Sequence, residues 1–200
     1  EKFLVARRLM YWQVYLHKTA LVAERMLVNI MLRAKELAQQ NIELFATPQL
    51  RYFLYGDINR NAFVTNNITI DNFINLDDND ISTAIKVWMQ HDDAVLSTLS
   101  KQFVNRHLLH IEFSNREFEL GTIQAKQTET MQKLHLNSLH EASFFVFADS
   151  IENHAYQKKN DDNIKILTKD QRIVDIADAS DMFDLSVLSK RVTKHFFCYP

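Results

Sequence analysis

Apolar residues recur at helical spacing along the first part of the chain. From Phe3 to Leu37 the sequence contains no Gly or Pro, and apolar positions fall on nearly every face of a helix. This pattern predicts one long helix that ends near Gln40 and is buried on all sides. Residues 45–55 predict a shorter helix with Pro48 in its first turn, where proline fits the backbone best.

The next segments predict a loop and two amphipathic helices. Residues 56–67 combine a Gly-Asp pair with several Asn residues, which is typical of a loop. Each helix then begins at a pair of aspartates, 77–78 or 92–93, either of which can cap it. The first runs to Trp88 and the second to Phe103, with apolar residues at helical spacing. These carboxylates are therefore interpreted as helix starts and not as general acids or bases.

The pattern changes after residue 105 to a mixture of strands and helix. The expected elements are a strand in 107–113, a helix in 115–135, a buried strand in 142–148, two short strands in 163–178 around Lys169-Asp170, and a strand at the end of 186–200. The predicted fold class is mostly α with a small α+β C-terminal subdomain. Its expected domains are 1–105, a set of helices, and 106–200, the α+β subdomain.

Composition narrows the possible classes of function. The chain has 200 residues, 46% of them hydrophobic, with 14 Phe but only 2 Gly and 2 Pro, which favours a helical core. The net charge of −2 offers no case for nucleic-acid binding. With Cys198 as the single cysteine, neither an intrachain disulfide nor a thiolate metal cluster can form, and a reducing compartment is expected. The sequence contains no apolar run that predicts a membrane span.

The N-terminal segment combines cations and aromatic rings without an acid. Residues 2–23 contain no Asp or Glu. On a continuous α-helix Arg7, Tyr11, Tyr15 and Lys18 share one narrow face, at i, i+4, i+8 and i+11. A buried cation needs an anion, which must come from another segment or from a ligand. Cations between rings suit a phosphorylated, ring-bearing ligand, although tyrosines at this spacing also occur in cores.

The segment EKFLVARRLMYWQVYLHKT resembles the helix that follows the catalytic motif in HD-superfamily deoxynucleoside triphosphate (dNTP) triphosphohydrolases. This group includes bacterial enzymes and a mammalian dNTP-depleting antiviral enzyme. Further similar segments are ATPQLRYFLYG (46–56), NLDDNDISTAIKVW (75–88), LSKQFVNRHL (99–108) and the ending LSKRVTKHFFCYP. The resemblance therefore runs along most of the chain and is closest to the bacterial HD phosphohydrolases. It implies hydrolysis of dNTPs to deoxynucleoside and triphosphate, in the cytoplasm.

The resemblance implies roles for three residues in a substrate site. Arg7 matches an arginine that contacts substrate phosphate. Tyr15 matches a tyrosine that packs against the deoxyribose, where its ring excludes a 2′-hydroxyl. Tyr11 stands where the mammalian relative has a histidine, so its substrate contact is the least directly supported of the three.

The resemblance also implies a regulatory nucleotide site at a subunit interface. His17 and Lys18 match residues that contact an activating nucleotide in the regulated relatives, and Arg106 matches an arginine of the same site. The implied partners are therefore a nucleoside triphosphate and further copies of the chain in a homo-oligomer.

The metal ligands of the family lie upstream of the matching helix. In these enzymes a His, a His-Asp pair and a distant Asp hold a divalent metal ion. The resemblance thus implies that this chain is the C-terminal portion of a longer enzyme, inactive by itself and without metal ligands or catalytic residues. His91-Asp92 is an HD dipeptide, but it is interpreted as part of a helix N-cap region.

Two other interpretations remain open from the sequence. The chain could be a non-catalytic helical module whose first helix binds a partner or another copy, which would not require Arg7 and Lys18 to be cationic. It could also belong to an HD phosphohydrolase that acts on another phosphorylated substrate. Nucleotide preference, metal identity and oligomeric state are not predicted.

Overall fold

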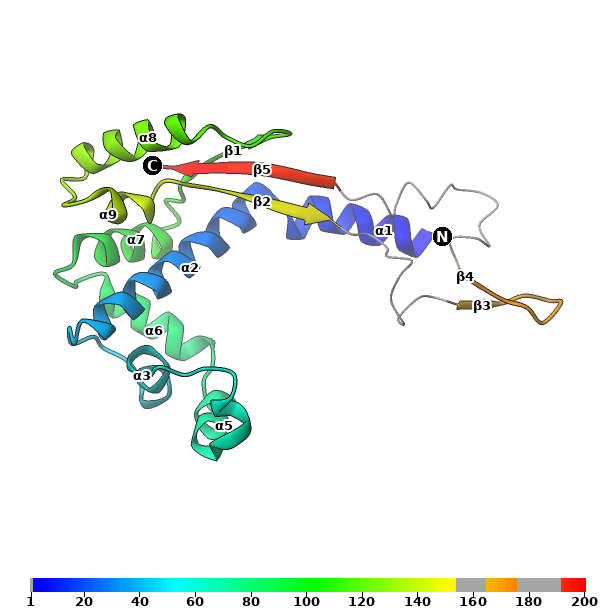
Figure 1. Cartoon of the computed structure of the whole chain (residues 1–200), viewed down its shortest axis with the longest axis horizontal. Coiled ribbons are helices and arrows are strands. Elements are labelled where there is room, and N and C mark those ends of the chain that lie inside the picture. The colour runs from blue at the N-terminus through cyan, green and yellow to red at the C-terminus, as the bar shows by residue number, and fades with distance from the viewer. Residues whose placement is uncertain (1, 154–164, 176–191) are drawn as a thin grey trace. The chain divides into compact units, whose positions relative to one another are not determined.

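The computed structural model describes residues 2–153, 165–175 and 192–200, most of which are helical (Figure 1). The helices are α1 (Lys2–Met10), the π-helix η1 (Tyr11–Tyr15), α2 (Lys18–Gln39), α3 (Pro48–Tyr55), α4 (Ala62–Thr65), α5 (Asn67–Ile74), α6 (Asp78–Trp88), α7 (Ala94–Val104), α8 (Leu120–Lys133) and α9 (Leu139–Ser143). The strands are β1 (His110–Ser114), β2 (Phe147–Asn153), β3 (Lys165–Leu167), β4 (Ile173–Asp175) and β5 (Val192–Tyr199). The predicted fold class, mostly α with a small α+β part, is confirmed.

The chain forms two compact units that interleave along the sequence. The sheet unit comprises Glu1–Leu21, Ile111–Glu119 and Ala148–Phe197, and the helical unit comprises Val22–His110, Leu120–Phe147 and Cys198–Pro200. The division reflects which residues contact one another within the chain. The expected domain boundary between residues 105 and 106 stays a prediction.

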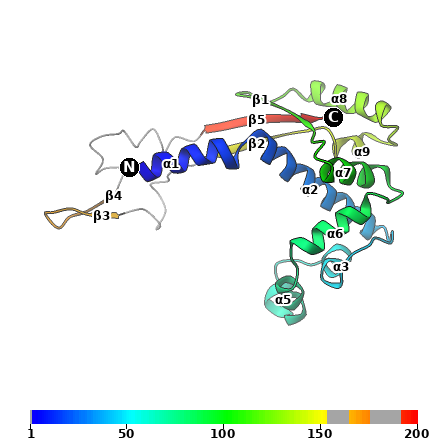
Figure 2. The ribbon, with the colours of Figure 1, turned by 180° about the vertical axis from the view of Figure 1, so that it is seen from behind.

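Helix α2 carries much of the core of the helical unit. Met26, Ile30 and Ala34 are fully buried along one of its faces, at the four-residue spacing that keeps side chains on one side of a helix. Both views show α6 and α7 beside this helix (Figures 1 and 2). Trp88 of α6 is also buried, and its indole N–H donates to the carbonyl of Phe45 at 3.0 Å. Burying aromatic and aliphatic side chains of this size provides the main favourable term in folding.

The aspartate caps predicted for two helices are confirmed. Asp77 precedes α6 and accepts hydrogen bonds from the N–H groups of Asn79 and Asp80, while the Asp80 carboxylate accepts from the N–H of Asp77. This reciprocal arrangement is a capping box. The Asp93 side chain likewise accepts from the N–H of Leu96 at 2.8 Å and caps α7.

Gly56 ends α3 where there is no room for a side chain. A Cβ atom at this position would lie 2.6 Å from the carbonyl oxygen of Tyr52. The Gly56 carbonyl accepts a hydrogen bond from Lys35 Nζ at 2.6 Å, and the Phe53 carbonyl accepts another at 2.7 Å. The Lys35 ammonium therefore satisfies two carbonyls at the helix end, where a positive charge is favourable.

Alanine at the two glycines should have effects of opposite sign. We expect Gly56→Ala to destabilise the protein by about 1–3 kcal/mol, because the backbone around Tyr52 must shift. The matched change Gly121→Ala, in α8, should stabilise it by up to about 1 kcal/mol, because a Cβ there meets nothing within 4 Å and alanine favours the helix. Urea unfolding of the intact protein measures both. Equal effects at the two sites would contradict the steric account.

Two predicted elements differ from the structure. The loop expected over 56–67 extends only to residue 61, because α4 and α5 follow. The Asn59 side chain accepts from the N–H of Ala62, and Asn66 caps α5 by accepting from Ile68 N–H at 3.0 Å. Asn is favourable at both kinds of position, so its frequency here reflects helix starts as well as turns.

The strand expected over 142–148 was wrong, although its burial was predicted correctly. Ser138 accepts from the N–H of Glu141 and begins α9, which runs to Ser143. Turns occupy the following residues, and β2 begins only at Phe147. Phe144, Phe145 and Val146 are buried. A short apolar run of this kind does not distinguish a buried strand from a buried helical turn.

The continuous first helix was also wrong. The chain changes from α1 to the π-helix η1, in which the N–H of Leu16 donates to the carbonyl of Tyr11 at 2.7 Å, and it leaves helical geometry before α2 begins at Lys18. The expected burial on all sides fails as well, since Phe3 is 66% exposed and Val14 54%. The extra residue in a π-turn rotates the following segment relative to a regular α-helix.

The strands form two small sheets. β5 lies between β1 and β2 in a three-stranded sheet. β3 and β4 form an antiparallel pair with Ile166 opposite Val174, and the predicted turn at Lys169-Asp170 joins them. The C-terminal strand is confirmed as β5, in which Phe196 packs edge-to-face on Phe113 with ring centroids 6.4 Å apart. None of the helices in the described ranges is long and apolar enough to cross a bilayer.

Candidate functional site

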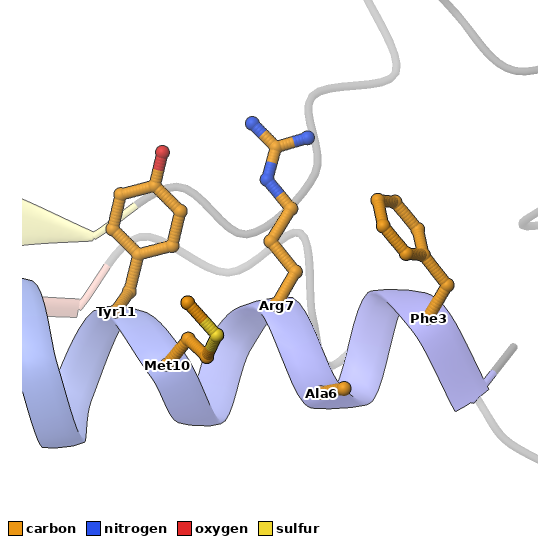
Figure 3. A pocket seen from close by; sticks show the side chains of 5 residues that line it. All are labelled: Phe3, Ala6, Arg7, Met10 and Tyr11. Atoms are coloured by element: carbon orange, nitrogen blue, oxygen red, sulfur yellow. The ribbon is translucent and has the colours of Figure 1, made fainter.

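One face of α1 and η1 carries a cation between two aromatic rings. Phe3, Arg7 and Tyr11 follow one another at four-residue intervals and point to the same side (Figure 3). The Arg7 guanidinium lies 5.8 Å from the centroid of the Tyr11 ring, within range of a cation–π interaction. Together with Ala6 and Met10, these side chains line a pocket of about 560 Å³.

The chemistry of this face suits an anion that carries an apolar or ring-bearing group. Among the lining residues that the structure describes, Arg7 is the only charged one, and the others offer aromatic or aliphatic surface. A guanidinium can donate two parallel hydrogen bonds to a phosphate or carboxylate. The neighbouring apolar side chains reduce competition from water. Because residues 2–23 contain no acid, no carboxylate of this segment can neutralise Arg7.

The structure brings only part of the predicted substrate stripe together. Arg7 and Tyr11 share the pocket, as expected from their spacing. Tyr15 is the last residue of η1, and its side chain lies outside the described part of the structure. Lys18 begins α2 after the break at Leu16 and His17, so the prediction that all four residues share one face of a single α-helix was wrong. The ligand contacts assigned to Arg7, Tyr11 and Tyr15 stay predictions.

The residues predicted to form a regulatory site lie in both units. His17 and Lys18 belong to the sheet unit and are exposed, and Nδ1 of His17 accepts from the N–H of Thr19 at 3.3 Å. Arg106 belongs to the helical unit, is exposed, and has a φ of 59° just after α7. A left-handed backbone is uncommon for arginine. The grouping of these three residues around a nucleotide stays a prediction.

Sequence reasoning missed Phe3, although the same spacing could have identified it. The predicted stripe begins at Arg7 and continues towards the C-terminus, whereas Phe3 is the residue one turn earlier. Its ring lines the pocket beside the cation.

A partly buried ionic network around Arg33 was missed as well. The Arg33 guanidinium binds both carboxylate oxygens of Asp93, with Nη2–Oδ2 at 2.6 Å and Nε–Oδ1 at 3.1 Å. It also donates to Glu36 at 3.1 Å and lies 3.6 Å from a carboxylate oxygen of Glu141. His140 is 3.0 Å from the second Glu36 oxygen. These residues connect α2, the start of α7 and α9, so the network holds helices distant in sequence together.

The network shifts the pKa values of its central pair. The hydrogen bond with Asp93 raises the pKa of Arg33 although burial opposes its charge. Burial disfavours the charged form of the Asp93 carboxyl, but hydrogen bonds from Arg33 and from the N–H of Leu96 outweigh burial and lower its pKa. Both residues are therefore held in their charged forms.

Acid should weaken this network. Because the pKa of Asp93 is lowered on folding, its stabilising contribution is complete above the unfolded value of about 4 and is lost as pH falls through the folded value. We expect Asp93→Asn, which keeps a capping oxygen, to lower the melting temperature at pH 7 and to have a smaller effect near pH 3. Thermal unfolding of both proteins across this range measures the difference. A pH-independent difference would contradict the assignment.

The His91-Asp92 dipeptide is engaged in a helix start. Nδ1 of His91 accepts from the N–H of Asp93 at 2.9 Å, and Asp93 caps α7 while binding Arg33. This confirms the interpretation of the dipeptide as part of an N-cap region. Within the described ranges, no group of three or more His, Cys, Asp or Glu side chains is arranged to hold a metal ion. The divalent metal that the resemblance implies stays a prediction.

Cys198 is buried near the end of β5. Burial raises the pKa of its thiol to about 12, despite the opposing influence of Arg25. A thiol with such a pKa remains protonated at neutral pH and is a poor nucleophile.

Proteins similar to this chain include two that are about twice its length. The chain is 51% identical to a phosphohydrolase from Bacteroides thetaiotaomicron whose crystal structure is known, with a TM-score of 0.90 over 99% of this chain and 49% of that one. It is also 26% identical to YwfO, an uncharacterised protein of Bacillus subtilis, over 100% of this chain and 44% of that protein. The sequence matches no protein-family model.

The chain thus spans about half the length of the relatives it matches. The share of identical residues and the agreement of the fold together establish that it is related to a phosphohydrolase.

Proposed function

We propose that this chain forms part of a metal-dependent HD phosphohydrolase that hydrolyses dNTPs to deoxynucleoside and triphosphate. Its relation to a phosphohydrolase supports the reaction class. The observation that carries the proposal is Arg7, a cation between Phe3 and Tyr11 at one pocket in an acid-free segment. A nucleotide offers the phosphate charge and the ring surface that this arrangement suits.

Each substrate-binding residue has a defined role in this proposal. Arg7 binds a phosphate of the substrate and offsets its negative charge. Tyr11 borders the same pocket and restrains Arg7 through its ring. Tyr15 packs against the deoxyribose and leaves no room for a 2′-hydroxyl. His17, Lys18 and Arg106 bind an activating nucleotide where subunits of a homo-oligomer meet.

The overall reaction is a hydrolysis at the α-phosphorus. Water supplies the oxygen that becomes bonded to the α-phosphorus, and the bond from that phosphorus to the 5′ oxygen breaks. The deoxynucleoside leaves with a protonated 5′ oxygen, and triphosphate is the second product. In this proposal the ligands of the divalent metal lie upstream of the chain, as the resemblance to the family implies; the described residues hold no group of three or more His, Cys, Asp or Glu side chains arranged to bind a metal ion.

Product analysis tests the proposed reaction. The intact protein is incubated with each of the four dNTPs and Mg²⁺ or Mn²⁺, and the products are separated by chromatography. We expect deoxynucleoside and inorganic triphosphate in equal amounts and much slower hydrolysis of ribonucleotides. Release of pyrophosphate or of single phosphates would contradict the proposed bond cleavage. Rapid hydrolysis of another phosphorylated substrate alone would favour a different HD phosphohydrolase.

A second candidate function is a helical module that binds a partner or another copy of the chain. The exposed apolar side chains Phe3, Leu9 and Val14 on α1 and η1 favour it. Leu9→Asp and Val14→Asp should then disrupt association in sedimentation experiments, while Arg7→Gln should leave association intact. Loss of dNTP hydrolysis in Arg7→Gln without any change in association would favour the enzyme.

A further inference from the structure

Phe3 lies where it can influence the cation of the pocket. It is one helical turn before Arg7, as Tyr11 is one turn after it, and all three side chains rise from the same face (Figure 3). Phe3 lines the pocket together with Arg7. Its side chain is nevertheless 66% exposed, so a large aromatic surface remains beside the cation. Burial in the core therefore does not account for a phenylalanine at this position.

We propose that Phe3 is a positioning residue for Arg7 and that it increases the affinity of the pocket for phosphate without contacting the phosphate itself. This inference rests on the proposed function, in which Arg7 binds substrate phosphate. Arginine loses considerable rotamer freedom when it binds a ligand. The Tyr11 ring lies 5.8 Å from the guanidinium; in this proposal the Phe3 ring limits its movement towards the other side along the helix, and such preorganisation reduces the entropy lost in the complex.

The Phe3 ring also changes the surroundings of the charge. Apolar surface beside the Arg7 guanidinium displaces water, and an ion pair is stronger where water screens it less. The two effects act in the same direction, because both favour the Arg7–phosphate contact. Removal of the Phe3 ring should also make the Arg7–phosphate contact more sensitive to salt, because salt weakens solvated ion pairs more than shielded ones.

Binding of inorganic triphosphate to the intact protein tests the role of Phe3 without requiring turnover. Isothermal titration would compare the natural protein with Phe3→Ala, Phe3→Leu, Arg7→Gln and the double variant. We expect Phe3→Ala to weaken binding about five- to tenfold and Phe3→Leu to retain most of the affinity, because leucine keeps an apolar side chain. In the Arg7→Gln background Phe3→Ala should have no further effect, since the two residues act through one contact.

Two further readouts distinguish positioning from a structural role. The melting temperature of Phe3→Ala should equal that of the natural protein, because the exposed ring contributes little to the core. The loss of affinity should increase with salt concentration. The role of Phe3 would be overturned if Phe3→Ala bound triphosphate as tightly as the natural protein. It would also be overturned if Phe3→Ala weakened binding equally in the natural protein and in the Arg7→Gln variant. Neither result would contradict the proposed function. If Arg7→Gln itself binds triphosphate as well as the natural protein, the proposed function fails too.

Discussion

Replacing Arg7 with Gln should lower kcat/KM for dNTP hydrolysis by the intact protein about 10²- to 10³-fold, as removal of one preorganised donor to a developing charge does in other enzymes. Glutamine retains a polar side chain of similar length but lacks the positive charge and the paired N–H donors. No acid in residues 2–23 needs Arg7 as a partner, and the side chain is exposed. The change should therefore affect hydrolysis without unfolding α1.

The variant Arg7→Lys distinguishes the effect of the positive charge from the effect of the paired hydrogen bonds. Arg7→Lys keeps the charge but cannot donate two parallel hydrogen bonds, so its activity should lie between those of the natural protein and Arg7→Gln. Arg60→Gln is the matched control, because Arg60 is also exposed but lies in the helical unit, away from the pocket residues in sequence. Steady-state kinetics with each dNTP measures all three variants. Full activity of Arg7→Gln would refute the phosphate contact.

The elements that were predicted correctly depend on local signals. Asp77 and Asp93 accept backbone N–H groups two and three residues ahead, so a short stretch of sequence contains the whole cap. Pro48 starts α3 for an equally local reason. The buried run 144–146 shows the limit of such signals. Its burial follows from composition, but the short helix α9 that precedes it begins with a hydrogen bond from Glu141 N–H to the Ser138 side chain, which the apolar pattern does not reveal.

The candidate site was predicted correctly only for the residues that follow regular α-helical spacing. Arg7 and Tyr11 are separated by four residues and share a pocket. Beyond Tyr11 the π-turn changes the rotation per residue, and Lys18 begins another helix. Nothing in the residue types of η1 distinguishes it from a regular helix, because π-turns use the same apolar residues and differ in one hydrogen-bond register. The break in the face predicted for Arg7, Tyr11, Tyr15 and Lys18 therefore could not be derived from the sequence.

The Arg33 network could not be predicted from the sequence either, but for a different reason. Arg33 lies 60 residues from Asp93 and more than 100 from Glu141 and His140. A cation on the core side of an amphipathic helix does indicate a buried partner. Its identity, however, depends on the packing of α2 against the start of α7 and α9, which no local pattern specifies.

Replacing Arg33 with Met should destabilise the intact protein by about 3–5 kcal/mol, since removal of one member of a buried ion pair leaves the other uncompensated. The side chains of Arg33 and Asp93 are only 9% and 15% exposed. Methionine fills much of the same volume, so the loss of charge and not a cavity should dominate. Urea unfolding at pH 7 measures the effect, which is a large share of the stability of a typical domain.

A control variant and the dependence on pH test whether the carboxylates around Arg33 cause this loss of stability. Arg51→Met removes a pair with Glu43 whose side chains are 46% and 78% exposed, and it should change stability little because solvent screens such pairs. The effect of Arg33→Met should also shrink as pH falls below about 4 towards 3, because protonation of Asp93 through its lowered pKa removes the charge that Arg33 compensates. If Arg33→Met lowered the free energy of unfolding equally at pH 7 and near pH 3, lost packing would be the cause instead of lost charge. A loss as small as that of Arg51→Met would show that Arg33 is not a structural ion-pair centre.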